Sequence, residues 1–215
     1  MTQAYADQLA QQVQQRSLRV RILIFPEVEI LDFAGPFEVF SVASRVARRD
    51  GWLNHPAFIV DTVAATRELV TARHGLKVLP DVDFTAAGPV DLLIVPGGVV
   101  DQPLNDAATL AWLEHACGAA GVVASVCTGA FLLARIGLLG NQRVTTHWED
   151  IPDLRAAYPD LEVVDSVPFV DLGGVLTSAG ISAGIDMSLH LVGRALGASA
   201  AEATARQMQY AWQVG

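Results

Sequence analysis

Short apolar runs that alternate with helical patterns constrain the fold of this chain more than any other feature. The clearest runs are residues 20–25, 91–95 and 122–126. Strands that are apolar along their whole length are typical of a parallel sheet covered by helices on both faces. We therefore expect an α/β fold of the flavodoxin-like, doubly wound type, with a mainly parallel sheet sandwiched by helices.

The same periodicities predict the remaining elements. A helix is expected to open at Gly35 and Pro36 and to run to residue 46, because Pro suits the first helical turn. An irregular hairpin is expected over residues 68–79. The other expected helices are residues 106–118, 128–137, 151–158, 185–196 and 200–212, and the other expected strands are residues 58–63, 143–146, 161–164, 169–171 and 175–178.

Composition bounds the size and the partners of the protein. The chain has 215 residues, of which 52% are hydrophobic and 17% charged, as expected for a globular domain with a proper core. We expect one domain over residues 18–215, preceded by an extension over residues 1–17. That extension has helical propensity but little apolar face, so it could be a frayed helix or a helix that packs on a partner subunit.

Charge and hydropathy argue against two classes of partner. A net charge of −9 does not suit a nucleic-acid surface, which needs clustered Lys and Arg. No apolar run reaches the roughly 18 residues that span a bilayer. The first 16 residues are polar and Gln-rich, unlike a signal peptide, so we expect a protein of the reducing cytoplasm.

One of the two cysteines lies at a position that favours reactivity. Cys127 ends the apolar run 122–126 and is followed by Thr128, Gly129 and a helical pattern, as in a nucleophile elbow. A thiol at a helix N-terminus is expected to lose its proton more easily. The alternative is that Cys127 is a small buried hydrophobe. Cys117 follows a helical pattern and is expected to fill the core; neither cysteine has metal-ligand spacing.

Two other loops should reach the same edge of the sheet, because sites in such folds lie beyond the carboxyl ends of the strands. The loop after residue 95 carries Gly97 and Gly98, and the N–H of Gly98 with that of Thr128 could form an oxyanion hole. The loop after residue 25 carries Asp32. This residue could be a capping or turn aspartate, or a carboxyl that moves a proton beside Cys127.

The histidines offer no firm partner for the thiol. His147, at the end of a short predicted strand, is a candidate base, but a histidine beside an aromatic residue is more often structural. His190 lies in an apolar helical pattern and is expected in the core. The three others are expected at the surface or in loops: His55, His74 and His115.

Six motifs occur in order along the chain, at residues 25–27, 31–36, 95–98, 125–130, 145–148 and 178–186. Together they resemble the ThiJ/PfpI superfamily over residues 20–196. Within it, the chain is most similar to the isocyanide hydratases and to the amino-terminal domain of AraC-type regulators. One departure is residues 99–103, which are bulkier and more acidic than the Gly-rich continuation of the hydratases.

The resemblance implies a function for these residues. In the hydratases a cysteine at the position of Cys127 is the nucleophile, with an aspartate at the position of Asp32 beside it and a threonine where Thr128 lies. The resemblance implies a lyase that turns an isocyanide, a small molecule, into an N-substituted formamide through a covalent thioimidate. It also implies that the protein uses no cofactor or metal and forms a homodimer. The alternatives are a ligand- or redox-sensing domain without turnover, and a glyoxalase- or amidase-like hydrolase.

Overall fold

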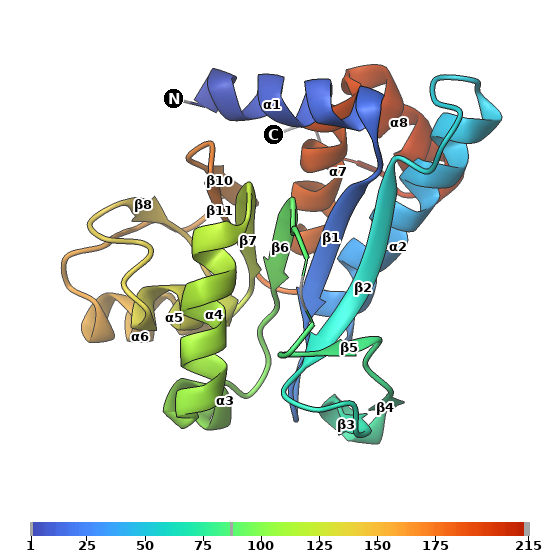
Figure 1. Ribbon diagram of the computed structural model, residues 1–215. Helices are drawn as coiled ribbons and strands as arrows, with labels where there is room; N and C mark the ends of the chain where they lie inside the picture. Colours follow the sequence, from blue (N-terminus) through green and yellow to red (C-terminus); the bar gives the residue numbers. More distant parts are fainter. Residues whose placement is uncertain (1, 87, 213–215) are drawn as a thin grey trace.

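A seven-stranded sheet forms the centre of the computed structural model, which describes residues 2–86 and 88–212, with side chains from residue 8 onward (Figure 1). All neighbouring strands are parallel except the pair at one edge, β10 and β11. The predicted doubly wound α/β architecture is confirmed. Across the sheet the strands are β10 (Phe169–Asp171), β11 (Val175–Ser178), β7 (Val122–Val126), β6 (Leu92–Val95), β1 (Leu18–Leu23), β2 (Phe58–Ala64) and β5 (Val82–Asp83).

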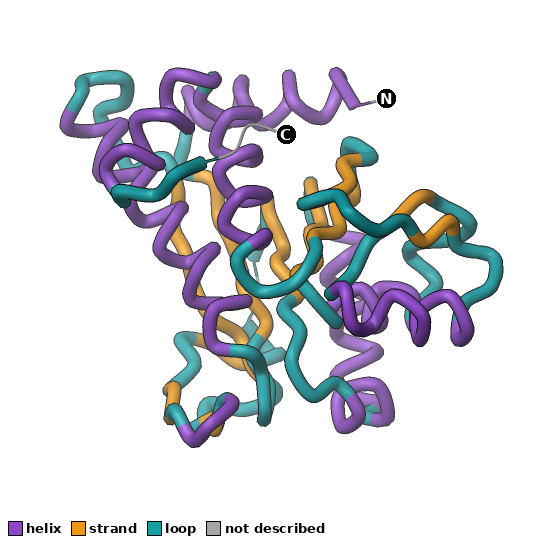
Figure 2. Tube along the Cα trace, turned by 180° about the vertical axis from the view of Figure 1, so that it is seen from behind, coloured by secondary structure: helices purple, strands orange, loops and turns teal. Residues whose placement is uncertain are grey.

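Helices cover both faces of this sheet. The helices α2 (Ile30–Arg49), α7 (Ala183–Leu196) and α8 (Ala198–Gln207) pack together on one face of the sheet. This face is turned toward the viewer in Figure 2. The opposite face carries α3 (Asp101–Asn105), α4 (Ala107–Ala119) and α5 (Gly129–Arg135). Every residue of β6 and β7 is buried between these layers. That double coverage explains why both strands are apolar along their whole length.

Smaller elements lie beside the ends of the strands. The predicted hairpin is confirmed as two short antiparallel strands, β3 (Val70–Thr71) and β4 (Lys77–Val78), around the 3-10 turn Arg73–Gly75. Beyond β10, the strands β8 (Arg143–Val144) and β9 (Glu162–Val163) form a parallel pair. The 3-10 turn Trp148–Asp150 and α6 (Ile151–Ala157) connect them.

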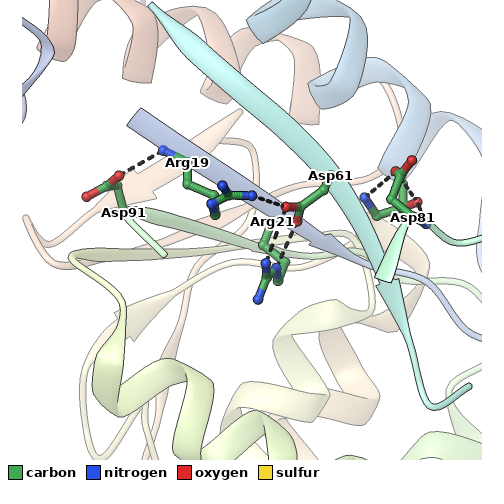
Figure 3. Close-up of polar contacts among 6 residues, drawn as sticks. Arg19, Arg21, Asp61, Asp81 and Asp91 are labelled. Carbon is green, nitrogen blue, oxygen red and sulfur yellow. Dashed lines mark hydrogen bonds and ion pairs between the residues drawn. The ribbon is translucent and has the colours of Figure 1, made fainter. Parts of the chain in front are cut away.

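Charged pairs cross-link the strands β1 and β2 (Figure 3). Arg21 Nε donates to Asp61 Oδ1 at 2.8 Å, and Arg19 donates to Asp61 Oδ2 at 2.7 Å. The Arg21 and Asp61 side chains are 5% and 9% exposed, so each buried charge needs an oppositely charged partner. The pairing therefore helps to hold the two strands in register.

The N-terminal extension forms α1 (Thr2–Gln15), which packs on α7 of the same chain. Leu9 and Val13 are buried there, at 2% and 0% exposure. Just after the helix, Arg16 makes two hydrogen bonds of 2.7 Å to the carboxylate of Asp91. Neither a frayed helix nor packing on a partner is needed to explain its apolar residues. Residue 1 and residues 213–215, which bound the predicted extension and domain, lie outside the described part.

Two helix boundaries differ from the sequence prediction by five residues. Helix α2 begins at Ile30, five residues before Gly35, because Glu29 caps it by accepting from the Ile30 N–H at 3.2 Å. Pro36 therefore lies inside the helix. Helix α8 ends at Gln207 rather than at residue 212, since Gln209 adopts a left-handed φ of +53° that a helix cannot continue through.

Two short elements, β5 and α3, escaped the sequence prediction, because each is too short to show a period. Within residues 2–86 and 88–212, no helix is both long and apolar enough to cross a membrane.

Candidate active site

Cys127 forms the sharp turn between β7 and α5. Its φ is +55°, a left-handed conformation that is strained for a residue with a side chain. Neighbouring segments hold the turn: the Cys127 N–H donates to Ala179 O at 3.3 Å, and its carbonyl accepts from Thr146 Oγ1 at 2.8 Å. The residue is only 6% exposed. The geometry thus has the strand–turn–helix form of a nucleophile elbow.

Asp32 approaches the thiol from the start of helix α2. It lies in the first turn of α2, not in the loop before the helix, and it is completely buried. The Gly97 N–H donates to Asp32 Oδ2 at 3.0 Å. Among the described residues, no nitrogen or oxygen donor reaches Oδ1, and the Cys127 thiol is a second donor to this carboxyl beside the Gly97 N–H.

Burial raises the pKa of Asp32 to about 7, and the negative charge of Glu29 adds to the shift. The Gly97 N–H and the Cys127 thiol act in the opposite direction, because both donate to the ionised form. A carboxyl with this pKa can hold or release a proton near neutral pH. Such a group suits general acid and base chemistry.

The thiol itself does not ionise easily in this environment. Burial raises the pKa of Cys127 to about 12, and the charge of Asp32 contributes further. The backbone N–H groups of Thr128 and Ile181 donate to the sulfur and lower its pKa, but they do not outweigh burial. This is opposite to the expectation drawn from the helix N-terminus alone. The proton of the pair therefore stays mainly on sulfur.

Gly97 and Gly98 connect one loop to Asp32 and to Thr128, the residue after Cys127. The Gly98 N–H donates to Thr128 Oγ1 at 2.9 Å, and that hydroxyl donates to Gly98 O at 3.0 Å. The expected oxyanion hole needs a free Gly98 N–H, so this expectation is wrong for the observed conformation. A side chain at Gly97 would overlap Thr128, and at Gly98, where φ is +134°, it would overlap Glu27 O. Both positions require glycine.

Sequence reasoning missed Ile181, whose N–H reaches the sulfur. It is a β-branched residue with a φ of +48°, just before α7. Nothing in its local sequence predicts that conformation. The available signal was the motif over residues 178–186, which contains it.

His147 lies near the elbow but does not pair with the thiol. Its Nδ1 is 3.2 Å from Asp150 Oδ2 and 3.4 Å from the Glu149 backbone nitrogen, so it either donates to the carboxylate or accepts from the Glu149 N–H. Its ring lies against Gly180, where an added Cβ would overlap ring atom Cδ2. Within residues 2–86 and 88–212 its ring makes no hydrogen bond to Cys127, so a direct role as a base on sulfur lacks geometric support.

The other candidates lie away from the elbow. His190 was expected in the core but is half-buried. It faces the partly polar edge strand β10, where its Nε2 is 2.7 Å from Asp171 Oδ2. Cys117 is buried in α4, and burial raises its pKa to about 12. His74 and His115 are exposed and His55 is half-buried. In the described part of the chain, no cluster of three or more His, Cys, Asp or Glu could hold a metal.

Exposed apolar side chains are next in sequence to several residues of the site. Leu31 precedes Asp32, Val99 follows Gly98, and Trp148 follows His147; their exposed fractions are 37%, 39% and 72%. Ile181 is 37% exposed as well. The bulky continuation after Gly98 therefore begins with a partly exposed apolar residue.

Comparison with known proteins links this geometry to one family. The DJ-1/PfpI family pattern matches residues 18–194. Isonitrile hydratase of Pseudomonas putida is 33% identical over 201 residues, which cover 91% of this chain and 79% of the hydratase. The HTH-type transcriptional regulator GbdR of Pseudomonas aeruginosa is 28% identical over 89% of this chain, which spans only 50% of the regulator.

Solved structures agree in fold. A THiJ/PfpI family protein from Pseudomonas syringae has a TM-score of 0.78 at 25% identity, covering 93% of this chain and 77% of that protein. Drosophila melanogaster DJ-1beta has a TM-score of 0.73 at 20% identity, covering 92% of this chain and all of that protein. The second likeness concerns the fold alone.

Proposed function

The chain belongs to the DJ-1/PfpI family, and we propose from this premise that it is a cysteine-dependent hydratase, a lyase that converts an isocyanide to an N-substituted formamide. One observation carries the proposal. The thiol of Cys127 contacts a fully buried carboxyl, Asp32, whose pKa is about 7. The 33% identity to isonitrile hydratase over most of the chain supports the choice of substrate class.

In the first step the sulfur of Cys127 bonds to the terminal carbon of R–N≡C. The thiol proton passes to the Asp32 carboxylate and from there to the same carbon, which gives the thioimidate Cys–S–CH=N–R. The high pKa of the thiol suits this sequence, because sulfur gives up its proton only as the new bond forms. The N–H groups of Thr128 and Ile181 stabilise the charge that develops on sulfur.

In the second step water adds to the thioimidate carbon. Asp32, as a carboxylate, accepts a proton from the water and delivers it to the substrate nitrogen. The C–S bond then breaks, and the hydroxyl proton returns to sulfur as the formamide leaves. The overall reaction adds one water to one isocyanide, and it needs neither oxidant nor cofactor.

The assay uses phenyl isocyanide, with formation of N-phenylformamide followed by chromatography. Cys127→Ala should abolish turnover, and Asp32→Asn should reduce it by about 10²-fold or more, in the range of lost general acid–base catalysis. Cys117→Ala is the matched control, because Cys117 is an equally buried thiol outside the site. Absence of formamide with the wild-type protein, or full activity of Cys127→Ala, contradicts the proposal.

A sensing domain without turnover is the second candidate, favoured by the similarity to GbdR. Its test is intact-mass measurement after mild peroxide. Selective oxidation at Cys127 combined with no formamide would favour sensing. The raised pKa and burial of the thiol argue for slow oxidation, since peroxide reacts with accessible thiolates.

The proposal also covers the domain limits, the cellular compartment and the oligomeric state. We propose one domain over residues 18–215 with residues 1–17 as an extension, acting in the reducing cytoplasm, where Cys117 and Cys127 stay thiols as they are here. We also propose a homodimer, the commonest symmetric assembly, whose mass light scattering would measure. A monomer at micromolar concentration would contradict it.

A further inference from the structure

The peptide that carries the Ile181 N–H is strained. A β-branched residue at a φ of +48° is a backbone outlier that persists only when its surroundings hold it. This conformation affects the reactive thiol, because the Ile181 N–H donates to the sulfur of Cys127. Whatever holds the peptide in place therefore also controls the environment of the thiol.

Backbone contacts hold this peptide on two sides. The Cys127 N–H donates to Ala179 O at 3.3 Å, and the Ala183 N–H donates to Gly180 O at 3.1 Å. The third side is covered by the ring of His147, which lies so close to Gly180 that no Cβ would fit between them. The ring fills the space that a side chain at position 180 would need.

The His147 ring is itself fixed. Its Nδ1 is 3.2 Å from Asp150 Oδ2, within the same turn after β8, and its side chain is only 15% exposed. The residue before it, Thr146, donates to the Cys127 carbonyl at 2.8 Å. His147 therefore lies between Asp150 and the segment that faces the sulfur.

We propose that His147 is a positioning residue: its ring, packed against Gly180, holds the Ile181 N–H against Cys127 Sγ. Negative charge develops at that atom when the thiol gives up its proton. The inference rests on the proposed hydratase function for its effect on turnover, whereas its effect on thiol reactivity is independent of any substrate. The ring shape performs this role, and its nitrogens do not transfer a proton.

The test compares His147→Ala, His147→Phe, Gly180→Ala and the double variant His147→Ala/Gly180→Ala. The first readout is the rate of Cys127 alkylation by iodoacetamide at pH 8, followed by intact mass in a Cys117→Ala background. Losing one hydrogen bond to the charged sulfur should slow alkylation about ten-fold. The second readout is kcat and KM with phenyl isocyanide.

We expect His147→Ala to lower kcat about ten-fold with little change in KM, and His147→Phe to restore most of that loss. Gly180→Ala should cause a similar loss, because its methyl displaces the ring without opening the site. The double variant should be no worse than either single variant, because the methyl then has room.

Three outcomes overturn the inference. In the first, His147→Phe loses as much as His147→Ala, which assigns the role to the ring nitrogens. In the second, the losses from His147→Ala and Gly180→Ala add independently. In the third, alkylation proceeds at the wild-type rate in Gly180→Ala. If the wild-type protein hydrates no isocyanide, the hydratase proposal fails while the alkylation rates still decide the role of His147. If His147→Ala does not fold, His147→Phe and Gly180→Ala decide it.

Discussion

Replacing Asp32 with asparagine should stabilise the protein at alkaline pH while it impairs the site. The folded-state pKa of Asp32 is about 7, against an ordinary value of 3.8. Below pH 4 the carboxyl is protonated in both states and has no effect on the pH dependence. Between pH 4 and pH 7 the unfolded chain releases the proton that the folded protein keeps, so stability falls as pH rises.

The size of this effect follows from the shift. About three pKa units correspond to about 4 kcal/mol of unfolding free energy, lost between pH 4 and pH 7 and constant above it. The amide of the Asp32→Asn variant has no such titration, and its oxygen can still accept the Gly97 N–H that Asp32 accepts at 3.0 Å. The thiol of Cys127 stays protonated throughout this range, since its pKa is about 12.

Urea unfolding at intervals from pH 4 to pH 8 measures the difference between the wild type and Asp32→Asn. Taking the difference removes the contributions of the other titrating groups to stability, because both proteins contain them. We expect the variant to gain stability relative to the wild type by up to about 4 kcal/mol at pH 8 and nothing at pH 4. If the unfolding free energy of both proteins changes with pH in the same way, the Asp32 carboxyl has the same pKa in the folded and unfolded states. That result would refute the raised pKa of Asp32 and the acid–base role that depends on it.

Three further predictions concern the scaffold. Leu9→Ala should cost about 2–5 kcal/mol in urea unfolding, because α1 packs through this fully buried side chain; a change below about 0.5 kcal/mol would mean that α1 is separable. Asp61→Ala should cost about 3–5 kcal/mol, since it leaves the buried Arg21 charge without its main partner, and an unchanged Tm would contradict this. Gly98→Ala should lower Tm and abolish turnover, because its methyl overlaps Glu27 O; normal activity would refute the tight approach of these loops.

The architecture could be predicted because its cause is local. The strands β6 and β7 are buried on both faces, and burial of that kind leaves a continuous apolar run in the sequence. The order of strands and helices then brings the carboxyl ends together, which predicts that Asp32, Gly97 and Cys127 meet. The observed contacts among these loops agree with that argument.

The parts that could not be predicted depend on contacts between distant segments. Whether the Gly98 N–H is free depends on the Thr128 hydroxyl, 30 residues away. The pKa of Cys127 depends on how completely other segments bury it, so the helix N-terminus alone gave the wrong direction. The left-handed φ of Ile181 is imposed by its surroundings, because its own side chain disfavours it.

The loop that carries Gly97 and Gly98 has a consequence for folding. The Gly97 N–H donates to Asp32, 65 positions away in the chain, and the Gly98 N–H donates to Thr128, 30 positions away. The Thr146 hydroxyl donates to the carbonyl of Cys127, 19 positions away. Contacts of such long sequence separation form late, when the whole sheet is assembled. Recovery of thiol reactivity and of turnover during refolding should therefore report completion of the entire topology, and a half-folded intermediate would carry no premature reactive centre.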